Sequence, residues 1–230
     1  MSRMFPFITD TWNPIAGNCP HNCSYCWAKK LIKNRPTLQV KYQHTDGFSF
    51  DPKQIHRKFQ PGSFVFVCDM LDLFAANVPM VAVQTIMKLI AAQPDVTFLL
   101  LTKNPRYAWI VEIPKNAVVG ATIESNIDYP VSQAPKQKDR LEAMQDITDR
   151  KMISIEPIMD FDLEPFANAI IKANPEFVAV GYDNYKNGLV EPSFSKTVHL
   201  IHALEGAGIK VYRKTIRDPV ILDCEGEEHK

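Results

Sequence analysis

The chain has 230 residues, a length that suits one domain, since domains usually run to about 100–200 residues. Its hydrophobic fraction of 46% and charged fraction of 23% exclude a disordered chain. Twenty-six basic residues balance 26 acidic ones, so no overall field attracts nucleic acid or an anionic membrane, although a local basic groove is compatible with this balance. No apolar run reaches the ~18–20 residues of a membrane span, and the first residues lack a signal-peptide core. We therefore expect a cytoplasmic protein without a membrane partner.

Short apolar runs rich in β-branched and aromatic residues alternate along the chain with longer stretches of helical character. We expect a first strand near residues 7–12 and a first helix over residues 25–33. The further strands are expected over residues 64–68, 96–101, 117–123, 152–155, 177–180 and 209–212, and the further helices over residues 81–92, 105–112, 136–149, 162–173 and 192–207. Most of these strands are continuous apolar runs, which is typical of parallel strands buried on both faces of a sheet. Within the expected helix over residues 136–149, the stretch from Leu141 to Ile147, with Asp139, Arg140 and Glu142 interleaved, has the pattern of an ordinary amphipathic surface helix.

This alternation of strands and helices predicts βαβ units and one mostly parallel sheet. Seven strands are more than a small flavodoxin-like sheet has and fewer than the eight of a complete (β/α)8 barrel. We therefore expect an α/β fold in which an open or partial barrel is favoured and a doubly wound sheet is the alternative. The chain over residues 1–230 is interpreted as one domain, with a polar insertion over residues 34–61 and a loose tail over residues 219–230.

Three of the five cysteines fall within eight residues, as Cys19, Cys23 and Cys26. A tight triplet in a chain of this kind indicates metal or redox chemistry rather than a disulfide framework. Three unrelated core cysteines are a weaker interpretation, because the proline, histidine and asparagine between them are typical of a loop. A structural zinc site normally needs four ligands, and no second pair exists, since Cys68 stands alone in a strand and Cys224 lies in the tail. A 4Fe–4S cluster held by three thiolates leaves one iron open to a small molecule, which is a catalytic arrangement.

The spacing Cys19-x-x-x-Cys23-x-x-Cys26, with Tyr25 directly before the last cysteine, resembles the cluster motif of the radical S-adenosylmethionine (SAM) superfamily. In that superfamily the motif follows the first strand of a partial (β/α)6-type parallel barrel, so the resemblance implies this fold. With seven strands expected, the last becomes a short extra C-terminal strand. It also implies that the three cysteines hold one 4Fe–4S cluster and that the amino and carboxylate groups of SAM bind the fourth iron. One electron, from a donor such as flavodoxin or ferredoxin, would then cleave SAM to methionine and a 5′-deoxyadenosyl radical that abstracts hydrogen from a substrate.

Further segments narrow the resemblance to the uncharacterised radical-SAM-like family that is often described as phage proteins. These segments are Thr11-Trp12-Asn13-Pro14, Asp72-Leu73-Phe74, Leu101-Thr102-Lys103-Asn104-Pro105 and Ile155-Glu156-Pro157. A weaker similarity, in the cysteine motif and the Leu101-Thr102-Lys103 segment, extends to spore photoproduct lyase, a DNA-repair member of the superfamily.

Polar residues follow most of the expected strands, and parallel barrels place their chemistry at these C-terminal strand ends. They are Asp69, Asp72, Thr102, Lys103, Glu124, Ser125, Asn126, Glu156, Asp183, Asn184, Arg213 and Lys214. Each of them is also explained as a helix cap or a solvated loop residue. Because all of them are expected at the same end of the barrel, we favour a functional site over these separate explanations.

Roles toward SAM follow from the chemistry of its parts. Glu124 suits the ribose diol as an acceptor, Asp69 is expected to accept from the methionyl amino group, and Tyr25 to face the adenine through its backbone. Lys103 suits either the SAM carboxylate or an anionic substrate, while Glu156 in an apolar strand needs a partner or a ligand if it is buried. The cofactor-binding residues that we predict are Tyr25, Asp69, Thr102, Lys103, Glu124 and Glu156.

Cys68 closes the second expected strand and is a candidate for the barrel mouth. Its position after the triplet resembles that of the cysteine that donates a hydrogen atom in spore photoproduct lyase. Inert packing is the alternative, because buried cysteines are usually structural. Lys29, Lys30 and Lys33 form a short basic face that is explained by solvation or by phosphate contact.

The prediction for the whole chain is a radical SAM enzyme that acts on an unknown substrate, with a nucleic acid or a protein as candidates. A short chain leaves little room for a substrate domain, so we expect a partner protein or a macromolecular substrate to cover the open side of the barrel. The alternatives are a non-catalytic zinc- or iron–sulfur-binding module for nucleic acid or a partner protein, and a barrel that binds the cluster but not SAM.

Overall fold

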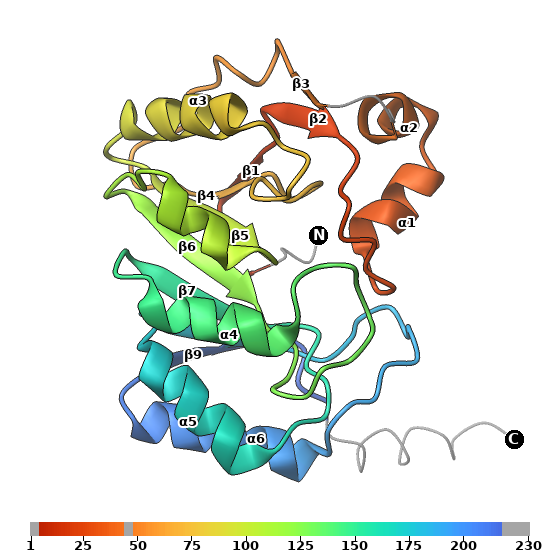
Figure 1. The fold of residues 1–230 in the computed structure, drawn as a ribbon, viewed down its shortest axis with the longest axis vertical. Coiled ribbons are helices and arrows are strands. Elements are labelled where there is room, and N and C mark those ends of the chain that lie inside the picture. The colour runs from red at the N-terminus through yellow and green to blue at the C-terminus, as the bar shows by residue number, and fades with distance from the viewer. Residues whose placement is uncertain (1–4, 44–47, 218–230) are drawn as a thin grey trace, which may run out of the picture.

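The computed structural model describes residues 5–43 and 48–217, and its centre is one parallel sheet (Figure 1). The seven strands, in sheet order, are β1 Asp10–Trp12, β4 Phe64–Val67, β5 Thr97–Thr102, β6 Ala117–Thr122, β7 Lys151–Ile155, β8 Phe177–Val180 and β9 Lys210–Arg213. All neighbouring pairs in it are parallel. The predicted α/β class is confirmed. Because sheet order follows chain order without reversal, the doubly wound alternative is wrong.

Aromatic contacts across the inside of the sheet show that it is curved into a partial barrel. Phe64 in β4 and Phe177 in β8 are four strand spacings apart, which is about 19 Å in a flat sheet. Their ring centroids are 6.4 Å apart. The ring of Phe7 fills the space between the two edges, with centroids 5.1 Å from Phe64 and 4.8 Å from Tyr212 in β9. The first described residues therefore close the inside of the barrel near the beginnings of its strands.

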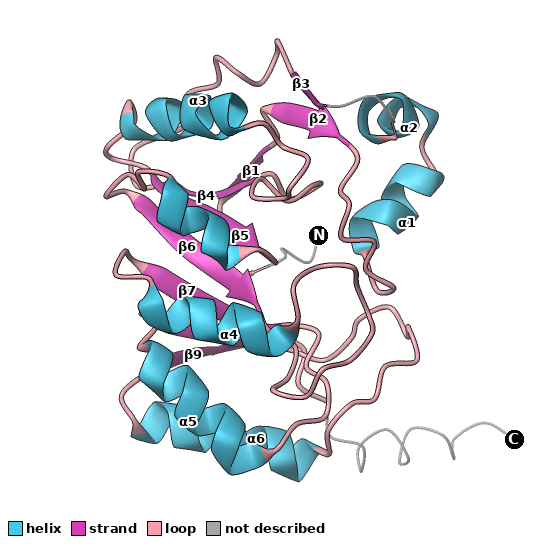
Figure 2. Cartoon of the chain, viewed as in Figure 1, coloured by secondary structure: helices cyan, strands magenta, loops and turns pink. Residues whose placement is uncertain are grey.

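Apolar residues on both faces of the strands explain the continuous apolar runs of the sequence. In β6, Val118 belongs to the inner core and Val119 to the outer core, and both are completely buried. The helices form an outer layer around the curved sheet (Figure 2). They are α3 Met80–Ala91, the 3-10 helix η1 Pro105–Ile110, α4 Gln137–Asp146, α5 Leu163–Ala173 and α6 Phe194–Gly206. None of the helices in the described ranges is long and apolar enough to cross a membrane.

The polar insertion over residues 34–61 contains regular structure that the sequence pattern did not predict. It holds α2 Pro36–Tyr42 and β3 Phe48–Phe50, and β3 pairs antiparallel with β2 Ile15–Gly17. Each of these strands has three residues, too few for a recognisable pattern. The cysteine segment therefore follows two strands, β1 and β2, and leads into α1 Trp27–Lys33. The predicted tail over residues 219–230, with Cys224, lies outside the described residues.

Candidate functional site

The three cysteines lie on the loop between β2 and α1, on the side of the molecule toward which the arrowhead of β6 points (Figure 1). All three thiols are free and half-buried. The sulfur of Cys26 accepts a hydrogen bond from the backbone N–H of Lys29 at 3.4 Å and so caps the start of α1. The loop after β6 holds the rest of the segment, because the N–H of Ser24 donates to the Val131 carbonyl at 2.9 Å.

The surroundings of Cys19 and Cys23 favour the neutral form of these two thiols. Burial and the nearby Asp72 carboxylate raise the pKa of Cys19 to about 12. Burial also raises the pKa of Cys23, which the ammonium of Lys103 partly offsets. A bound cationic metal group supplies the positive charge that such thiolates lack, and a soft set of three thiolates fits an iron–sulfur cluster with one open iron. Among the residues that the structure describes, no three His, Cys, Asp or Glu side chains surround a single metal-ion position.

Asp72, in the loop after β4, fastens the cysteine loop to the neighbouring strand β5. Its Oδ2 accepts hydrogen bonds from Nε2 of His21 at 2.8 Å, from the hydroxyl of Thr102 at 2.9 Å and from the backbone N–H of Lys103 at 2.7 Å. Although burial alone would raise it, these hydrogen bonds and the charge of His21 hold the pKa of Asp72 below its usual value. His21 is 6% exposed, so this contact is a buried one within the loop between Cys19 and Cys23.

Glu124, at the end of β6, is the centre of a buried charge network. Its Oε1 accepts hydrogen bonds from Nζ of Lys103 at 2.7 Å and from the hydroxyl of Tyr25. Nη2 of Arg140 in α4 lies 2.9 Å from Oε2, and the side chains of Glu124 and Arg140 are both 0% exposed. Burial works against ionisation, but Lys103 and Arg140 outweigh it and lower the pKa of Glu124 to about 2. Burial and Glu124 raise the pKa of Tyr25 well above its usual value, so its hydroxyl remains a donor.

The structure therefore brings together four of the predicted site residues, Tyr25, Thr102, Lys103 and Glu124, beside the cysteine loop. Both carboxylate oxygens of Glu124 face protein side chains here, and its contact with a ribose stays a prediction. Thr102 is the last residue of β5 rather than a loop residue, and its hydroxyl donates to Asp72, which in turn contacts His21 of the cysteine loop.

Asp69 and Cys68 lie apart from this network. Oδ1 of Asp69 accepts a hydrogen bond from the side-chain amide of Asn13 at 2.5 Å, and burial raises the pKa of Asp69. Cys68 is 2% exposed and belongs to the outer hydrophobic core that also contains Ile15 and Tyr42. Burial, with the charge of Asp69, raises the pKa of the Cys68 thiol well above its usual value. Its role as a hydrogen donor stays a prediction.

Glu156, after β7, has the partner that its burial requires. Its carboxylate lies 2.6 Å from Nζ of Lys214, and each side chain is 15% exposed. Burial raises the pKa of Glu156 despite the charge of Lys214. Its contact with a ligand stays a prediction.

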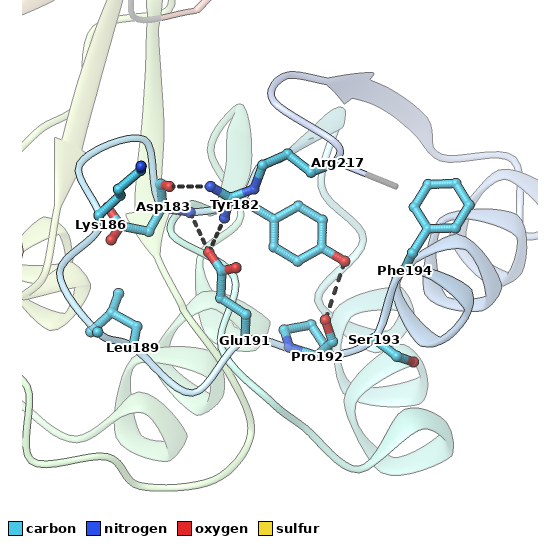
Figure 3. A pocket seen from close by; sticks show the side chains of 10 residues that line it. Tyr182, Asp183, Lys186, Leu189, Glu191, Pro192, Ser193, Phe194 and Arg217 are labelled. Carbon is cyan, nitrogen blue, oxygen red and sulfur yellow. Dashed lines mark hydrogen bonds and ion pairs between the residues drawn. The ribbon is translucent and has the colours of Figure 1, made fainter. Parts of the chain in front are cut away.

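A separate cavity of about 430 Å³ lies in the segment between β8 and α6 (Figure 3). Its lining includes the ring of Tyr182, over which the guanidinium of Arg217 lies 5.2 Å from the centroid. Arg217 also donates to the carbonyl of Asp183 at 3.0 Å and to the carboxylate of Glu191. Of the polar residues expected at the strand ends, Asp183 lines this cavity, whereas none of the predicted cofactor-binding residues does.

The sequence pattern missed two contributors to the site, His21 and Arg140. The interpretation of the Leu141-to-Ile147 helix and its flanking charges as an ordinary surface helix is wrong at Arg140, which is 1% exposed and donates to the carbonyl of Thr122. A helix with a charged residue every few positions is expected to face solvent on that side. No local feature of the sequence distinguishes a buried charged residue from its exposed neighbours. The signal for His21 was its place between Cys19 and Cys23, two of the predicted ligands.

The sequence over residues 4–181 matches the family described as "Protein of unknown function (DUF5131)". This description names no activity and no phage origin. No curated protein matches the chain in sequence.

Solved structures of spore photoproduct lyase resemble the chain in fold. A cysteine-to-serine mutant is 10% identical with a TM-score of 0.64, covering 93% of this chain and 79% of that one. A tyrosine-to-phenylalanine mutant is 10% identical with a TM-score of 0.60, covering 89% and 76%. A double mutant with bound AdoMet, which is SAM, and dinucleoside spore photoproduct is 11% identical with a TM-score of 0.53, covering 85% and 60%. These likenesses show that the curved parallel sheet is shared.

Proposed function

The chain belongs to the DUF5131 family of proteins of unknown function, and from this premise we propose that it is a radical SAM enzyme. The observation that carries the proposal is a loop with three free cysteines, held at the C-terminal edge of a curved parallel sheet. A 4Fe–4S cluster bound there would supply the electron that cleaves SAM to methionine and a 5′-deoxyadenosyl radical. The likeness in fold to a spore photoproduct lyase with bound AdoMet supports SAM as the second cofactor.

Each group of residues has a distinct task in this proposal. Cys19, Cys23 and Cys26 hold the cluster and leave one iron to SAM. Lys103 contacts both Glu124 and Tyr25, which is part of the cysteine loop. Lys103 and Tyr25 set the local charge and shape of the part of the site that would face SAM. Asp69 and Glu156 remain the proposed contacts for SAM at the ends of β4 and β7. A small electron carrier such as flavodoxin or ferredoxin is the proposed donor.

Metal and cofactor analysis of anaerobically prepared protein tests the proposal directly. We expect about four irons and four acid-labile sulfides per chain, since that is the composition of one such cluster. After reduction, 5′-deoxyadenosine should form from SAM. Cys68→Ala is the matched control, because it removes a cysteine outside the loop and should retain both properties. One zinc per chain without iron, after anaerobic reconstitution, would instead establish the non-catalytic metal module.

A basic flank beside the cysteine loop favours a nucleic acid as the substrate. Residues 11–43 contain five Lys and Arg and no Asp or Glu, whereas the whole chain is neutral. Lys29, Lys30 and Lys33 in α1 are exposed, and Nζ of Lys30 lies 5.3 Å from the ring centroid of Tyr185, which is 54% exposed. Exposed basic and aromatic side chains together bind phosphates and stack bases. The dinucleoside ligand of the similar spore photoproduct lyase structures supports the same class.

Charge reversal on the basic flank tests this substrate class. We expect a labelled single-stranded 20-nucleotide DNA or RNA to bind at low salt, with an affinity that falls as salt rises. The variant Lys30→Glu/Lys33→Glu should weaken binding about tenfold or more, because it removes two cations and adds two like charges. The control Lys172→Glu reverses a charge on the outer helix α5 and should bind as the wild type does. Absence of binding at low salt would overturn the nucleic-acid proposal.

A further inference from the structure

Each gap between the three cysteines holds one side chain that is bound to a buried carboxylate of the barrel. Between Cys19 and Cys23, Nε2 of His21 donates to Asp72 at 2.8 Å. Between Cys23 and Cys26, the hydroxyl of Tyr25 donates to Glu124. The two carboxylates come from the loops that follow two different strands, Asp72 after β4 and Glu124 after β6. The loop is thus attached to the barrel at two points that alternate with its cysteines.

Both carboxylates are themselves held rigidly. Besides His21, Asp72 accepts hydrogen bonds from the hydroxyl of Thr102 at 2.9 Å and, through Oδ1, from the backbone N–H of Phe74 at 2.9 Å. A carboxylate with this many donors has one orientation available to it. Because an ionised carboxylate oxygen only accepts hydrogen bonds, Nε2 of His21 carries the proton in this contact.

Glu124 is held from both sides by cations. Lys103 contacts one carboxylate oxygen at 2.7 Å and also donates to the hydroxyl of Tyr25 at 2.5 Å. Arg140 faces the other oxygen from α4, and its Nη1 donates to the carbonyl of Thr122. The second attachment point therefore joins the loop to strands β5 and β6 and to helix α4.

We propose that Asp72 and Glu124 are positioning residues, which hold the cysteine loop in its ligand-binding shape before any cluster is present. The inference rests on the proposed function only in that the positioned thiols are cluster ligands. Ordering a flexible loop costs conformational entropy. If the loop is already ordered when the protein folds, cofactor binding does not have to meet this cost, which is the advantage of a preorganised site. Arg140 positions the loop indirectly, because it orients Glu124.

The test uses the cluster-free protein and measures how fast iodoacetamide alkylates each cysteine, resolved by peptide mass spectrometry. His21→Leu removes the first attachment, and Tyr25→Phe removes the second by deleting one oxygen atom. We expect about a tenfold faster alkylation of Cys19 in the first variant and of Cys23 in the second. His21→Gln, whose amide nitrogen can still donate to Asp72, should restore the wild-type rate.

Two controls separate loosening of the loop from general destabilisation. Tyr182→Phe also deletes a buried hydroxyl, but this hydroxyl contacts Thr197 at 2.8 Å and is not one of the attachments of the cysteine loop. The variant should leave the alkylation rates of all three cysteines unchanged. Cys68, 2% exposed, reports unfolding of the whole barrel in the same experiment and should stay protected in every variant.

A second measurement connects the loop to the cluster. After reconstitution, His21→Leu and Tyr25→Phe should lose iron to a chelator several-fold faster than the wild type, and His21→Gln should not. Wild-type alkylation rates in Tyr25→Phe and His21→Leu would overturn the inference, and Tyr25→Phe alone decides it if His21→Leu does not fold. Failure of the wild type to take up iron would overturn the proposed function instead, without affecting the alkylation result.

Discussion

Nη2 of Arg140 lies 2.9 Å from the carboxylate of Glu124, and both side chains are completely buried. The two facing atoms, Nη2 and Oε2, have no aligned hydrogen-bond partner, so charge rather than directed bonding holds the pair together. Removing one member of such a pair leaves an uncompensated charge in the interior, which costs more than the pair contributes.

Glu124→Gln should lower the free energy of unfolding by about 3–5 kcal/mol, because it leaves the buried cations of Lys103 and Arg140 without a counter-charge. Arg140→Met should cost less, since Lys103 still pairs with the carboxylate at 2.7 Å. Urea unfolding measures both. Arg150→Met, which breaks an ion pair whose side chains are 43% and 40% exposed, is the control and should cost no more than about 1 kcal/mol. Equal costs for the buried and exposed variants would contradict the prediction.

Stability should depend on pH in the range set by Glu124. Its pKa is about 2 in the folded protein and 4.5 ordinarily, so the folded state favours the ionised form. The resulting stabilisation, about 3 kcal/mol, is fully present above pH ~4.5 and is lost as the pH falls toward ~2. Urea unfolding as a function of pH measures it, with Glu124→Gln as the reference. The stability difference between wild type and this variant should shrink across that range, and a constant difference would refute the assignment.

Each of Cys19→Ala, Cys23→Ala and Cys26→Ala should lose the cluster or hold it weakly, because each removes one of the three proposed protein ligands. Iron and sulfide analysis, together with 5′-deoxyadenosine formation, measures the effect. Full cluster content and SAM cleavage in two of these three variants would be incompatible with the assignment.

Glu124→Ala distinguishes two roles for this carboxylate. If it accepts a hydrogen bond from the SAM ribose, SAM affinity should fall roughly ten- to hundredfold, or about 1.5–3 kcal/mol, at unchanged iron content. If it only positions Tyr25, iron content should fall as well. Equilibrium binding of SAM to reconstituted protein, with iron measured on the same samples, separates the two results.

Phe5→Ala should destabilise the barrel by about 3–5 kcal/mol, since it opens a cavity in the inner core. Phe5 is 2% exposed and belongs to the inner cluster with residues of several strands. Thermal or urea unfolding measures the loss. Val81→Ala is the control, because Val81 is 65% exposed on α3 and its truncation should change stability by no more than about 0.5 kcal/mol. A similar small change for Phe5→Ala would show that the inner core does not depend on this ring.

The strands that sequence analysis predicted correctly are those whose local pattern is strong. Strand β8, for example, was expected over residues 177–180 and spans Phe177–Val180. Strands β2 and β3 were missed, because three-residue strands lack a pattern and their pairing joins Ile15 to Phe50 across a long stretch of chain. The buried state of Arg140 was missed for a related reason, since its neighbours in sequence are those of a surface helix.

The sequence by itself determined the alternation of strands and helices and the spacing of Cys19, Cys23 and Cys26, because apolar runs and covalent spacing are local properties. Only the tertiary structure decided which groups meet that loop. His21 reaches Asp72 across 51 residues and Tyr25 reaches Glu124 across 99. Such contacts depend on the order and curvature of the sheet, which bring the ends of β4 and β6 to one rim, and no local pattern contains that information.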